Sequence, residues 1–353
     1  MQRAQRKLDH IKYALALEDG PLATHLADLR FIHNCLPELS PADIDLSCEI
    51  LGKQLRLPFF IDAITGGTKE VARINENLAL VARETGCGIA CGSEYGAVHK
   101  KGTDTTSYEI IRKVNPDGLV LGNVSALATP TEAQAALDIL GADGLEIHLN
   151  AAQEMFMPEG DRDFSKIFSN IKAIREALDK PVIIKETGCG IAAEEFKKLS
   201  EICKIEYFDC AGAGGTNFIA IEAARSSLPA LDLLAWGHPT SWSLIDAHES
   251  LPKTSRFIAS GGLRTGLDLA KAFALGASAI SMAGPILKAV MNGGVAGGVD
   301  YINKVTNDLK IIMTLLNVKS VTELRKVPLL IFGDTKDYCL ERGYDLAKLS
   351  RSR

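Results

Sequence analysis

The sequence has no long apolar run and no excess of basic residues. No stretch approaches 18 consecutive apolar residues, so we expect no membrane-spanning helix. The 39 Lys and Arg residues are outnumbered by 44 Asp and Glu residues, which gives a net charge of −5. This balance argues against nucleic acid or an anionic membrane as the main partner. Residues 1–21 are charged and lack the apolar centre of a signal peptide, so we expect a cytoplasmic protein.

Several catalytic and metal-binding motifs are also absent. The chain contains neither the G-x-S-x-G turn of hydrolases nor the H-E-x-x-H pair of zinc peptidases. Its 8 cysteines include no C-x-x-C pair, so we expect buried thiols in a reducing compartment rather than disulfides or a structural zinc. An apolar fraction of 46% and a charged fraction of 24% are typical of a folded protein and exclude global disorder.

Short apolar segments alternate with segments of helical period through most of the chain. The short segments are apolar on both faces, as buried parallel strands are. Eight such strand–helix units predict a closed (β/α)8 TIM barrel. A doubly wound sheet is the alternative, but it rarely carries so many units in unbroken alternation. The predicted strands are Leu57–Ala63, Cys87–Ser93, Leu119–Ser125, Gly144–Asn150, Pro181–Thr187, Tyr207–Gly212, Arg256–Gly262 and Ala277–Gly284.

We expect residues 1–353 to form a single domain with a barrel core at about 57–290. Residues 1–56 are then an N-terminal extension, and residues 291–353 form C-terminal helices, including a long helix near 299–316. The connection 227–254 is unusually long and holds both tryptophans, which is typical of a functional loop or an interface.

Glycine-rich turns follow the last three predicted strands, at Gly214-Gly215-Thr216, Gly261-Gly262 and Ala283-Gly284. Active sites of these barrels form where the strands end. Small residues let backbone N–H groups approach an anion, and a helix N-terminus adds positive potential. The turns therefore predict a phosphate site, with tight turns that bind nothing as the alternative.

Polar residues follow the fourth and fifth predicted strands. His148 and Asn150 share one face of a strand, and Gln153 and Glu154 follow in the next loop. One carboxylate suits Mg²⁺ that is held together with a substrate phosphate, and it does not suit a structural zinc. Lys185 ends an apolar strand, so it either stabilises a bound anion or forms an ion pair with Glu186 or another neighbour.

Near the N-terminus, Arg6, Lys7 and His10 are three cationic or titratable side chains within five residues. They form either the solvated face of a helix or a basic arm that folds over a phosphorylated substrate.

Together these motifs resemble those of the type 2 isopentenyl-diphosphate isomerases, FMN-dependent barrels of isoprenoid synthesis. The resemblance extends from Arg6 to about Lys288. Its most specific motifs are His148-Leu-Asn150-x-x-Gln153-Glu154 and Met157-Pro-Glu-Gly-Asp-Arg162. The others are Arg6-Lys7-x-x-His10, Ala63-Ile-Thr-Gly-Gly67, Gly92-Ser93, Lys185-Glu186, Gly214-Gly-Thr-Asn217, Ser260-Gly-Gly262 and Met282-Ala-Gly284.

The resemblance implies isomerisation of isopentenyl diphosphate to dimethylallyl diphosphate by reduced FMN and Mg²⁺, with NADPH or NADH as reductant and a tetramer or octamer as the assembly. It assigns Mg²⁺ to Glu154, catalysis to Gln153 and His148, and stabilisation of anionic reduced flavin to Lys185. The implied FMN contacts are Ala63, Ile64, Thr65, Ser93, Asn123, Lys185, Thr216, Gly261, Gly262, Leu263, Arg264, Ala283 and Gly284. The implied substrate contacts are Arg6, Lys7, His10, Ser93, His148, Asn150 and Gln153.

The chain departs from that family at Glu94-Tyr95, where members often carry another polar pair such as Gln-Arg. Lys100 or Lys101 are the candidates to replace the lost diphosphate contact. Two other functions stay open: an FMN-dependent oxidoreductase of the 2-hydroxy-acid oxidase type, and a barrel that binds a phosphate ligand without catalysis. The oxidase needs a His base and an Arg clamp in the late strands, and the sixth strand ends in Ala211-Gly-Ala-Gly-Gly215 instead.

Overall fold

Eight parallel strands close into a barrel in the computed structural model, which describes residues 2–99, 103–226 and 231–351. Parallel pairing of β9 with β10 and of β11 with β4 completes the ring. The predicted (β/α)8 barrel is therefore confirmed, and each predicted strand contains one barrel strand. These are β4 (Phe59–Ile61), β5 (Gly88–Ala90), β6 (Val120–Ser125), β7 (Gly144–Leu149), β8 (Val182–Glu186), β9 (Tyr207–Asp209), β10 (Arg256–Ala259) and β11 (Ala279–Met282).

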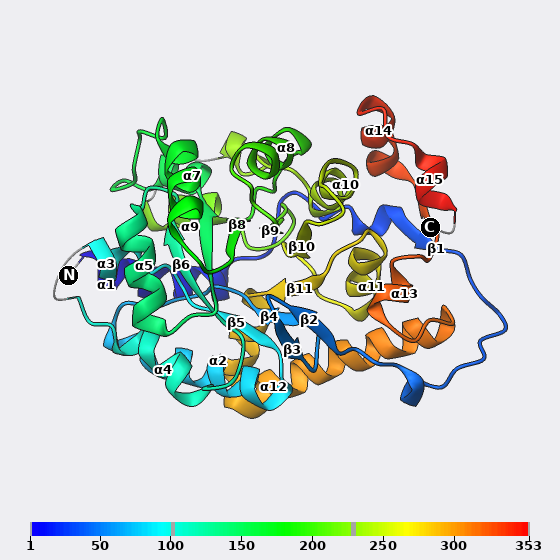
Figure 1. Cartoon of the computed structure of the whole chain (residues 1–353), viewed down its shortest axis with the longest axis horizontal. Coiled ribbons are helices and arrows are strands. Elements are labelled where there is room, and N and C mark those ends of the chain that lie inside the picture. Colours follow the sequence, from blue (N-terminus) through cyan, green and yellow to red (C-terminus); the bar gives the residue numbers. More distant parts are fainter. Residues whose placement is uncertain (1, 100–102, 227–230, 352–353) are drawn as a thin grey trace.

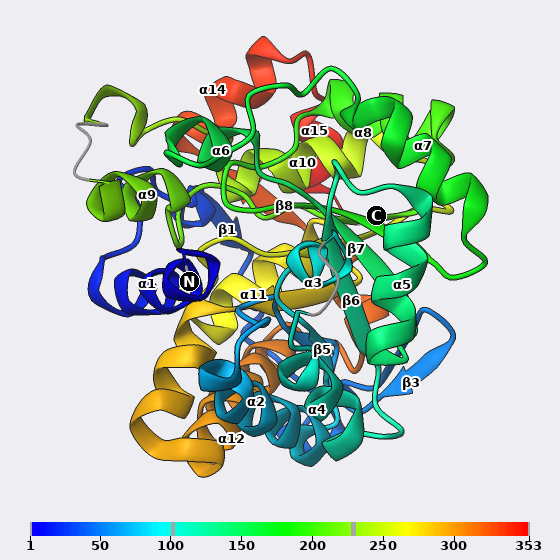
Figure 2. The same cartoon turned by 90° about the vertical axis from the view of Figure 1, so that its left-hand side faces the viewer.

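Helices cover the outside of the barrel, with α2, α4 and α12 packed along one side (Figure 2). Their ends follow local rules. Thr129 caps α5 by accepting a hydrogen bond from the backbone of Glu132, whose side chain bonds back. The surrounding helices are α2 (Ala72–Thr85), α3 (Tyr95–His99), α4 (Thr106–Val114), α5 (Pro130–Leu140), α6 (Ala151–Phe156), α7 (Ile167–Ala177), α8 (Ala193–Ile202), α9 (Phe218–Ser226), α10 (Thr240–Ser250), α11 (Gly266–Ala274) and α12 (Gly284–Leu315).

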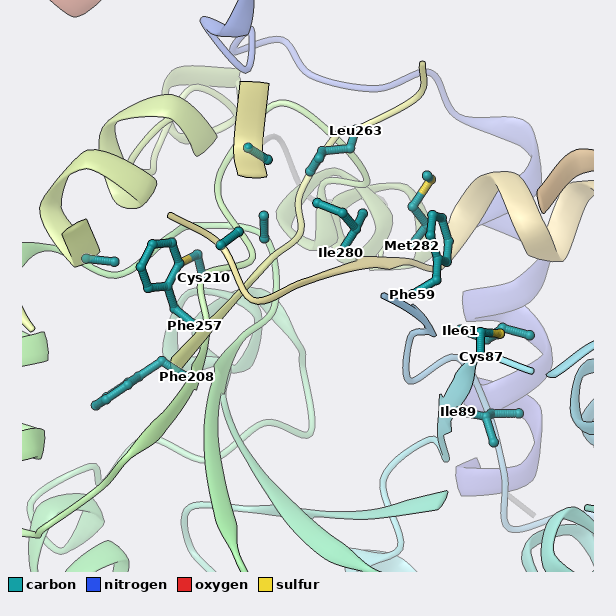
Figure 3. Close-up of a cluster of buried hydrophobic side chains, with 14 of the residues drawn as sticks. Phe59, Ile61, Cys87, Ile89, Phe208, Cys210, Phe257, Leu263, Ile280 and Met282 are labelled. Carbon is teal, nitrogen blue, oxygen red and sulfur yellow. The ribbon is translucent and has the colours of Figure 1, made fainter. Parts of the chain in front are cut away.

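Alternate side chains of the strands enter two different cores. Phe59, Ile61 and Ile89 point outward into the layer between strands and helices (Figure 3). Phe60 and Ala90 belong instead to a separate inner cluster. Because successive residues of a strand face opposite sides, a strand buried on both sides must be apolar throughout. This explains why the strands are largely apolar in the sequence, with polar residues mostly toward their carboxyl ends.

The N-terminal extension closes the bottom of the barrel. A hairpin of β2 (Cys48–Ile50) and β3 (Lys53–Leu55) places Ile50 and Leu55 in the inner cluster. With the amino end of the barrel filled, the interior opens only toward the carboxyl ends of the strands.

The two extensions also pair with each other. β1 (Leu29–Phe31) and β12 (Leu329–Ile331) form an antiparallel two-stranded sheet, and Figure 1 shows the blue β1 segment beside the red C-terminal helices. The extensions also contain α1 (Gln2–Ala16), α13 (Val321–Leu324), α14 (Gly333–Glu341), α15 (Leu346–Ser350) and the 3-10 turns η1 (Leu26–Asp28) and η2 (Pro41–Asp43); η3 (Lys69–Val71) and η4 (Leu231–Leu233) lie in connections of the barrel.

The predicted long helix near 299–316 lies in the second part of α12. α12 extends over Gly284–Leu315, but the backbone at Gly294, where φ is 62° and ψ is −152°, is not helical. Two helical segments therefore meet at a kink at this glycine. Within the described residues, no helix combines the length and hydropathy that crossing a membrane requires.

Candidate active site

A cavity of about 510 Å³ opens at the carboxyl ends of the barrel strands. Residues that follow most of the barrel strands line it, and α1 contributes further side chains. Thr65 and Leu263 are buried behind its wall. The other sequence-predicted site residues line it together: Arg6, Lys7, His10, Ala63, Ile64, Ser93, Asn123, His148, Asn150, Gln153, Glu154, Lys185, Thr216, Gly261, Gly262, Arg264, Ala283 and Gly284.

Glycines let the late strand ends pack closely around this cavity. A Cβ on Gly261 would lie 2.0 Å from the carbonyl oxygen of Gly212, and Gly261 has a φ of +91°. A Cβ on Gly262 would lie 2.3 Å from the carbonyl oxygen of Gly214. Beside these turns, Ala283 and Gly284 begin the long helix α12. The first turn of a helix leaves N–H groups without partners inside the helix, which suits a phosphate.

Helix α1 covers one side of the cavity mouth and packs beside α9 (Figure 2). Ile11 anchors it in a small cluster with Val71 and Leu287. The same side of the helix directs Arg6, Lys7 and His10 to the cavity, which Ile11 also lines. The three residues therefore belong to the cavity wall, as the arm interpretation of the sequence requires.

Glu222 of α9 connects the arm to the barrel. Its Oε1 lies 2.8 Å from Nε2 of His10 and accepts a hydrogen bond from the amide of Gln153 at 3.0 Å. Its Oε2 accepts a hydrogen bond from Nε of Arg225 at 2.7 Å. Burial raises the pKa of Glu222, but the bonds from His10 and Gln153 outweigh burial and lower this pKa to about 2. Burial lowers the pKa of His10.

Replacing Glu222 with glutamine is expected to lower the free energy of unfolding by about 1–3 kcal/mol at pH 7, because charged hydrogen bonds are lost. The pKa of Glu222 in the folded state is lower than the 4.5 of an unperturbed glutamate, so the charge stabilises the fold above about pH 4.5. That contribution is lost as the pH falls toward 2. Urea unfolding at pH 7 and at pH 3 measures the difference.

Glu159→Gln is the matched control, since Glu159 contacts the other side of Arg225 and its side chain is 39% exposed. We expect it to cost less than about 1 kcal/mol. A Glu222→Gln deficit of equal size at both pH values would contradict the charged interaction.

The end of β7 gathers the polar residues that the sequence singles out. Nδ2 of Asn150 donates to Oε1 of Glu154 at 3.0 Å and to Oε1 of Gln153 at 3.3 Å. The backbone N–H of Asp161 donates to the other oxygen of Glu154 at 2.9 Å. Burial raises the pKa of Glu154, and a bound cation would reverse this by favouring the charged carboxylate.

His148 lies beside Asn123 at the top of neighbouring strands. Its Nδ1 is 2.7 Å from Oδ1 of Asn123, and the amide of Asn123 donates to Glu146 at 2.9 Å. An amide oxygen only accepts, so Nδ1 of His148 carries the proton. Burial, followed by the charges of Lys7 and Lys185, lowers the pKa of His148 to about 3. The imidazole is therefore neutral before an anion binds.

Lys185 pairs with two aspartates rather than with its sequence neighbour Glu186. Its Nζ lies 3.0 Å from Oδ2 of Asp62 and 3.0 Å from Oδ2 of Asp209. Glu186 instead accepts backbone N–H groups of residues 187–189. The ion-pair partners of Lys185 are therefore residues from other strands and not Glu186.

Sequence reasoning missed Asp62, Asp209, Glu146 and Glu222. Asp62 and Asp209 stand where β4 and β9 end, so the strand-end rule would have selected them. Glu94 and Tyr95 are the pair at which the chain differs from the family pattern. Tyr95 lines the cavity, while Glu94 is buried, and burial raises the pKa of Glu94 to about 8. Lys100 and Lys101 lie outside the described residues.

The residues around the cavity fit a flavin phosphate and a magnesium ion. The glycine turns bring backbone to the cavity wall, and a Cβ at Gly261 or Gly262 would collide with the backbone of a neighbouring turn. Thr65 stands between the cavity-lining residues Ile64 and Gly66, and its Oγ1 is buried with no hydrogen-bond partner in the part of the chain that the structure describes. Glu154 would supply a charged oxygen ligand of the kind that Mg²⁺ shares with a substrate phosphate.

Comparisons with known proteins agree with this geometry. A family model described as FMN-dependent dehydrogenase matches residues 125–329. A mandelate oxidase structure has a TM-score of 0.67 at 18% identity, over 94% of this chain and 98% of that chain. A lactate oxidase from Pediococcus acidilactici has a TM-score of 0.69 at 15% identity, over 94% of each chain. At these identities the likeness is one of fold.

Closer relatives extend over nearly the whole chain. The isopentenyl-diphosphate delta-isomerases of Geobacillus sp. and Bacillus pumilus are each 41% identical to it over 346 residues. These matches cover 98% of this chain, and 98% and 96% of the two relatives. That of Staphylococcus haemolyticus is 38% identical over 98% of both chains. The chain thus belongs to the FMN-dependent, type 2 isopentenyl-diphosphate delta-isomerase family.

Proposed function

We propose that this protein converts isopentenyl diphosphate to dimethylallyl diphosphate, with reduced FMN and Mg²⁺ in the cavity at the top of the barrel. The observation that carries the proposal is the meeting of three features in one cavity: a glycine cradle, a basic helical arm and one carboxylate beside an amide cluster. A diphosphate needs the arm and the metal, and a flavin phosphate needs the cradle.

The reaction moves a double bond, so one carbon gains a proton and another loses one. Protonating the alkene builds positive charge at a tertiary carbon, which must be stabilised away from water. When bound, reduced FMN supplies an electron-rich edge that can donate and accept the proton. NADPH or NADH is the proposed reductant.

The chain's own residues hold the substrate and exclude water. Arg6 and Lys7 bind the diphosphate, and His148 and Asn150 contact it from the end of β7. The amide of Gln153 donates a hydrogen bond to Glu222 at 3.0 Å, and in this position Gln153 orients the alkene. Nε2 of His10 lies 2.8 Å from the same carboxylate. Glu154 binds Mg²⁺. Gln153 and His148 are thus our candidates for the catalytic residues.

Two measurements test this function. A yellow protein with bound FMN is the first expected result. Under anaerobic conditions, with the flavin reduced and Mg²⁺ present, the second is conversion of isopentenyl diphosphate followed by NMR, with deuterium entering the product from D₂O. Flavin bleaching by lactate or glycolate without this exchange would favour the oxidase, and FMN binding without either reaction would favour a passive phosphate-binding barrel.

Deleting residues 1–10 is expected to raise KM for the diphosphate by about 100-fold, because two charge-assisted contacts are lost. The Arg6→Ala/Lys7→Ala variant retains the helix and should show most of the effect. Urea unfolding should still give one cooperative transition for the barrel, since the residues removed lie outside its strands. Wild-type kinetics for both variants would make α1 a passive segment.

The assembly and the location of the protein remain predictions. We propose a homo-oligomer, a tetramer or an octamer, in the cytoplasm. The segment 227–254 exposes Trp236, which is 61% accessible, and size-exclusion chromatography with light scattering tests the assembly.

A further inference from the structure

Arg225 of α9 lies behind the cavity wall and bonds to two carboxylates at once. Its Nε donates a hydrogen bond to Oε2 of Glu222 at 2.7 Å, and its Nη2 donates to Oε2 of Glu159 at 2.7 Å. The side chain of Arg225 is 15% exposed, and among the described residues it is not part of the cavity lining. An effect of Arg225 on a bound substrate must therefore pass through the residues that it contacts.

The two carboxylates bonded to Arg225 also contact helix α1. Oε1 of Glu222 lies 2.8 Å from Nε2 of His10. Oε1 of Glu159 lies 3.8 Å from Nη1 of Arg6. Arg6 and His10 stand four residues apart, so they lie about one turn apart on the same face of the helix. The contacts form a closed ring that starts and ends on α1, and Arg225 is the member that joins the two acids.

A guanidinium group suits this place in the ring. It is planar and carries five N–H donors at fixed angles, so bonds from Nε and Nη2 hold two carboxylates at a set separation. Glu222 stands three residues before Arg225 on the same helix, whereas Glu159 comes from the loop between α6 and α7. Arg225 therefore ties this loop to α9 and sets the spacing of the two acids that contact α1.

Arg225 also balances charge at this edge of the cavity. The side chain of Glu222 is fully buried, and Glu159 lines the cavity. A buried carboxylate that loses its cationic partner is strongly unfavourable. Without the guanidinium, Glu159 would also compete with a diphosphate for the charge of Arg6.

Glu222 extends the ring to a candidate catalytic residue. The oxygen that faces His10 also accepts the hydrogen bond from the amide of Gln153 at 3.0 Å. Because Arg225 holds the other oxygen, the carboxylate presents this one in a fixed direction. The placement of α1 and the placement of Gln153 therefore depend on the same side chain.

We propose that Arg225 is a positioning residue, which places α1 over the diphosphate and the amide of Gln153 beside the alkene by fixing Glu159 and Glu222. This inference rests on the proposed function, because that function supplies the substrate. Arg225 makes the binding of the diphosphate and the orientation of the alkene interdependent, although it lies outside the cavity lining.

The test begins with Arg225→Gln, which removes the charge and at least one of the two bonds. We expect KM to rise about 10-fold and kcat to fall about 10-fold, because both the arm and Gln153 lose their support. The dissociation constant of inorganic diphosphate in the presence of Mg²⁺, measured by calorimetry, should rise with KM. FMN affinity and the flavin spectrum should stay as in the wild type.

Arg225→Lys tests the geometry of the ring. Lysine keeps the positive charge but has a single nitrogen in place of the planar fork. We therefore expect it to recover only part of the loss in KM and kcat. If Arg225→Gln fails to fold, Arg225→Lys serves for the same measurements.

A double-variant comparison separates positioning from direct contact with the substrate. Arg6→Ala/His10→Ala removes the two side chains through which the ring holds α1. Adding Arg225→Gln to this variant should change KM by less than about twofold, since the arm is already lost, and should still lower kcat through Gln153.

Arg342→Gln is the matched control. Arg342 bonds to Glu194 at 2.7 Å, and both residues lie outside the cavity lining. Wild-type kinetics are expected for this variant, because the loss of an arginine–glutamate pair elsewhere in the protein should not reach the substrate.

A full tenfold rise in KM when Arg225→Gln is added to the arm variant would overturn the inference, since Arg225 would then act independently of α1. Complete recovery by Arg225→Lys would overturn it as well, because charge alone would suffice. Wild-type kinetics in Arg225→Gln would overturn it and leave the proposed function standing. A wild-type protein that does not isomerise isopentenyl diphosphate would overturn both proposals.

Discussion

Replacing Glu154 with glutamine is expected to lower turnover by at least about 100-fold and to raise the Mg²⁺ concentration needed for half-maximal rate. The carboxylate lines the cavity and lies 3.0 Å from the amide of Asn150. Glutamine retains the size and one of the two accepted hydrogen bonds, since its amide nitrogen cannot accept, and it lacks the charge that attracts Mg²⁺. Metal-assisted neutralisation contributes several kcal/mol, and each ~1.4 kcal/mol corresponds to a tenfold change in rate.

The measurement is the initial rate as a function of Mg²⁺ concentration, with the flavin spectrum recorded on the same samples. FMN should remain bound, because Glu154 lies on α6 and the glycine turns follow β9, β10 and β11. Asp161→Asn is the matched control: Asp161 also lines the cavity, and its contact with Glu154 is through the backbone N–H, which the substitution leaves in place. An unchanged Mg²⁺ dependence in Glu154→Gln would rule out this residue as the metal ligand.

The barrel strands could be located from the sequence because their burial is uniform. All residues of β6 and β8 are buried, so each strand begins with three residues that have no polar side chain and becomes polar only toward its carboxyl end. The caps are just as local: Thr129 and Glu132 stand three residues apart in the sequence and bond to each other in the structure. A feature that depends on residues within one turn or one strand can be predicted from a single sequence.

The extensions show where this reasoning stops. β1 and β12 are each three residues long, and their register joins Leu29 to Ile331. No local pattern predicts a pair separated by almost the whole chain, since the short strands are stable only through tertiary contacts.

The site residues also fall into a group that the sequence can predict and a group that it cannot. His148, Asn150 and Lys185 stand at strand ends, and strand ends converge in any closed parallel barrel. Glu222 stands in the middle of a helix, and its importance depends on α1 lying next to α9. The partners of Lys185 come from strands that are far apart in sequence. Strand-end positions can be predicted from topology, whereas the charge balance of the site requires the packed structure.

Replacing Gly261 with alanine is expected to lower the free energy of unfolding by about 3 kcal/mol and FMN affinity by about 100-fold. The new Cβ would lie 2.0 Å from the carbonyl oxygen and 2.5 Å from the backbone nitrogen of Gly212, and φ at this position is +91°. Backbone atoms cannot move aside as a flexible side chain can, so strain and overpacking add. Because this turn forms part of the cradle, its displacement removes charge-assisted bonds to the flavin phosphate.

Gly293→Ala is the matched control, because no atom lies within 4 Å of the position its Cβ would take. Alanine in α12 should stabilise the protein slightly, by about 0.5–1 kcal/mol, and leave FMN binding unchanged. Urea unfolding with and without FMN, together with flavin fluorescence, separates the two effects of Gly261→Ala. If that variant is destabilised but binds FMN as tightly as the wild type, the phosphate lies away from this turn, and the glycines serve only the close packing of β9 against β10.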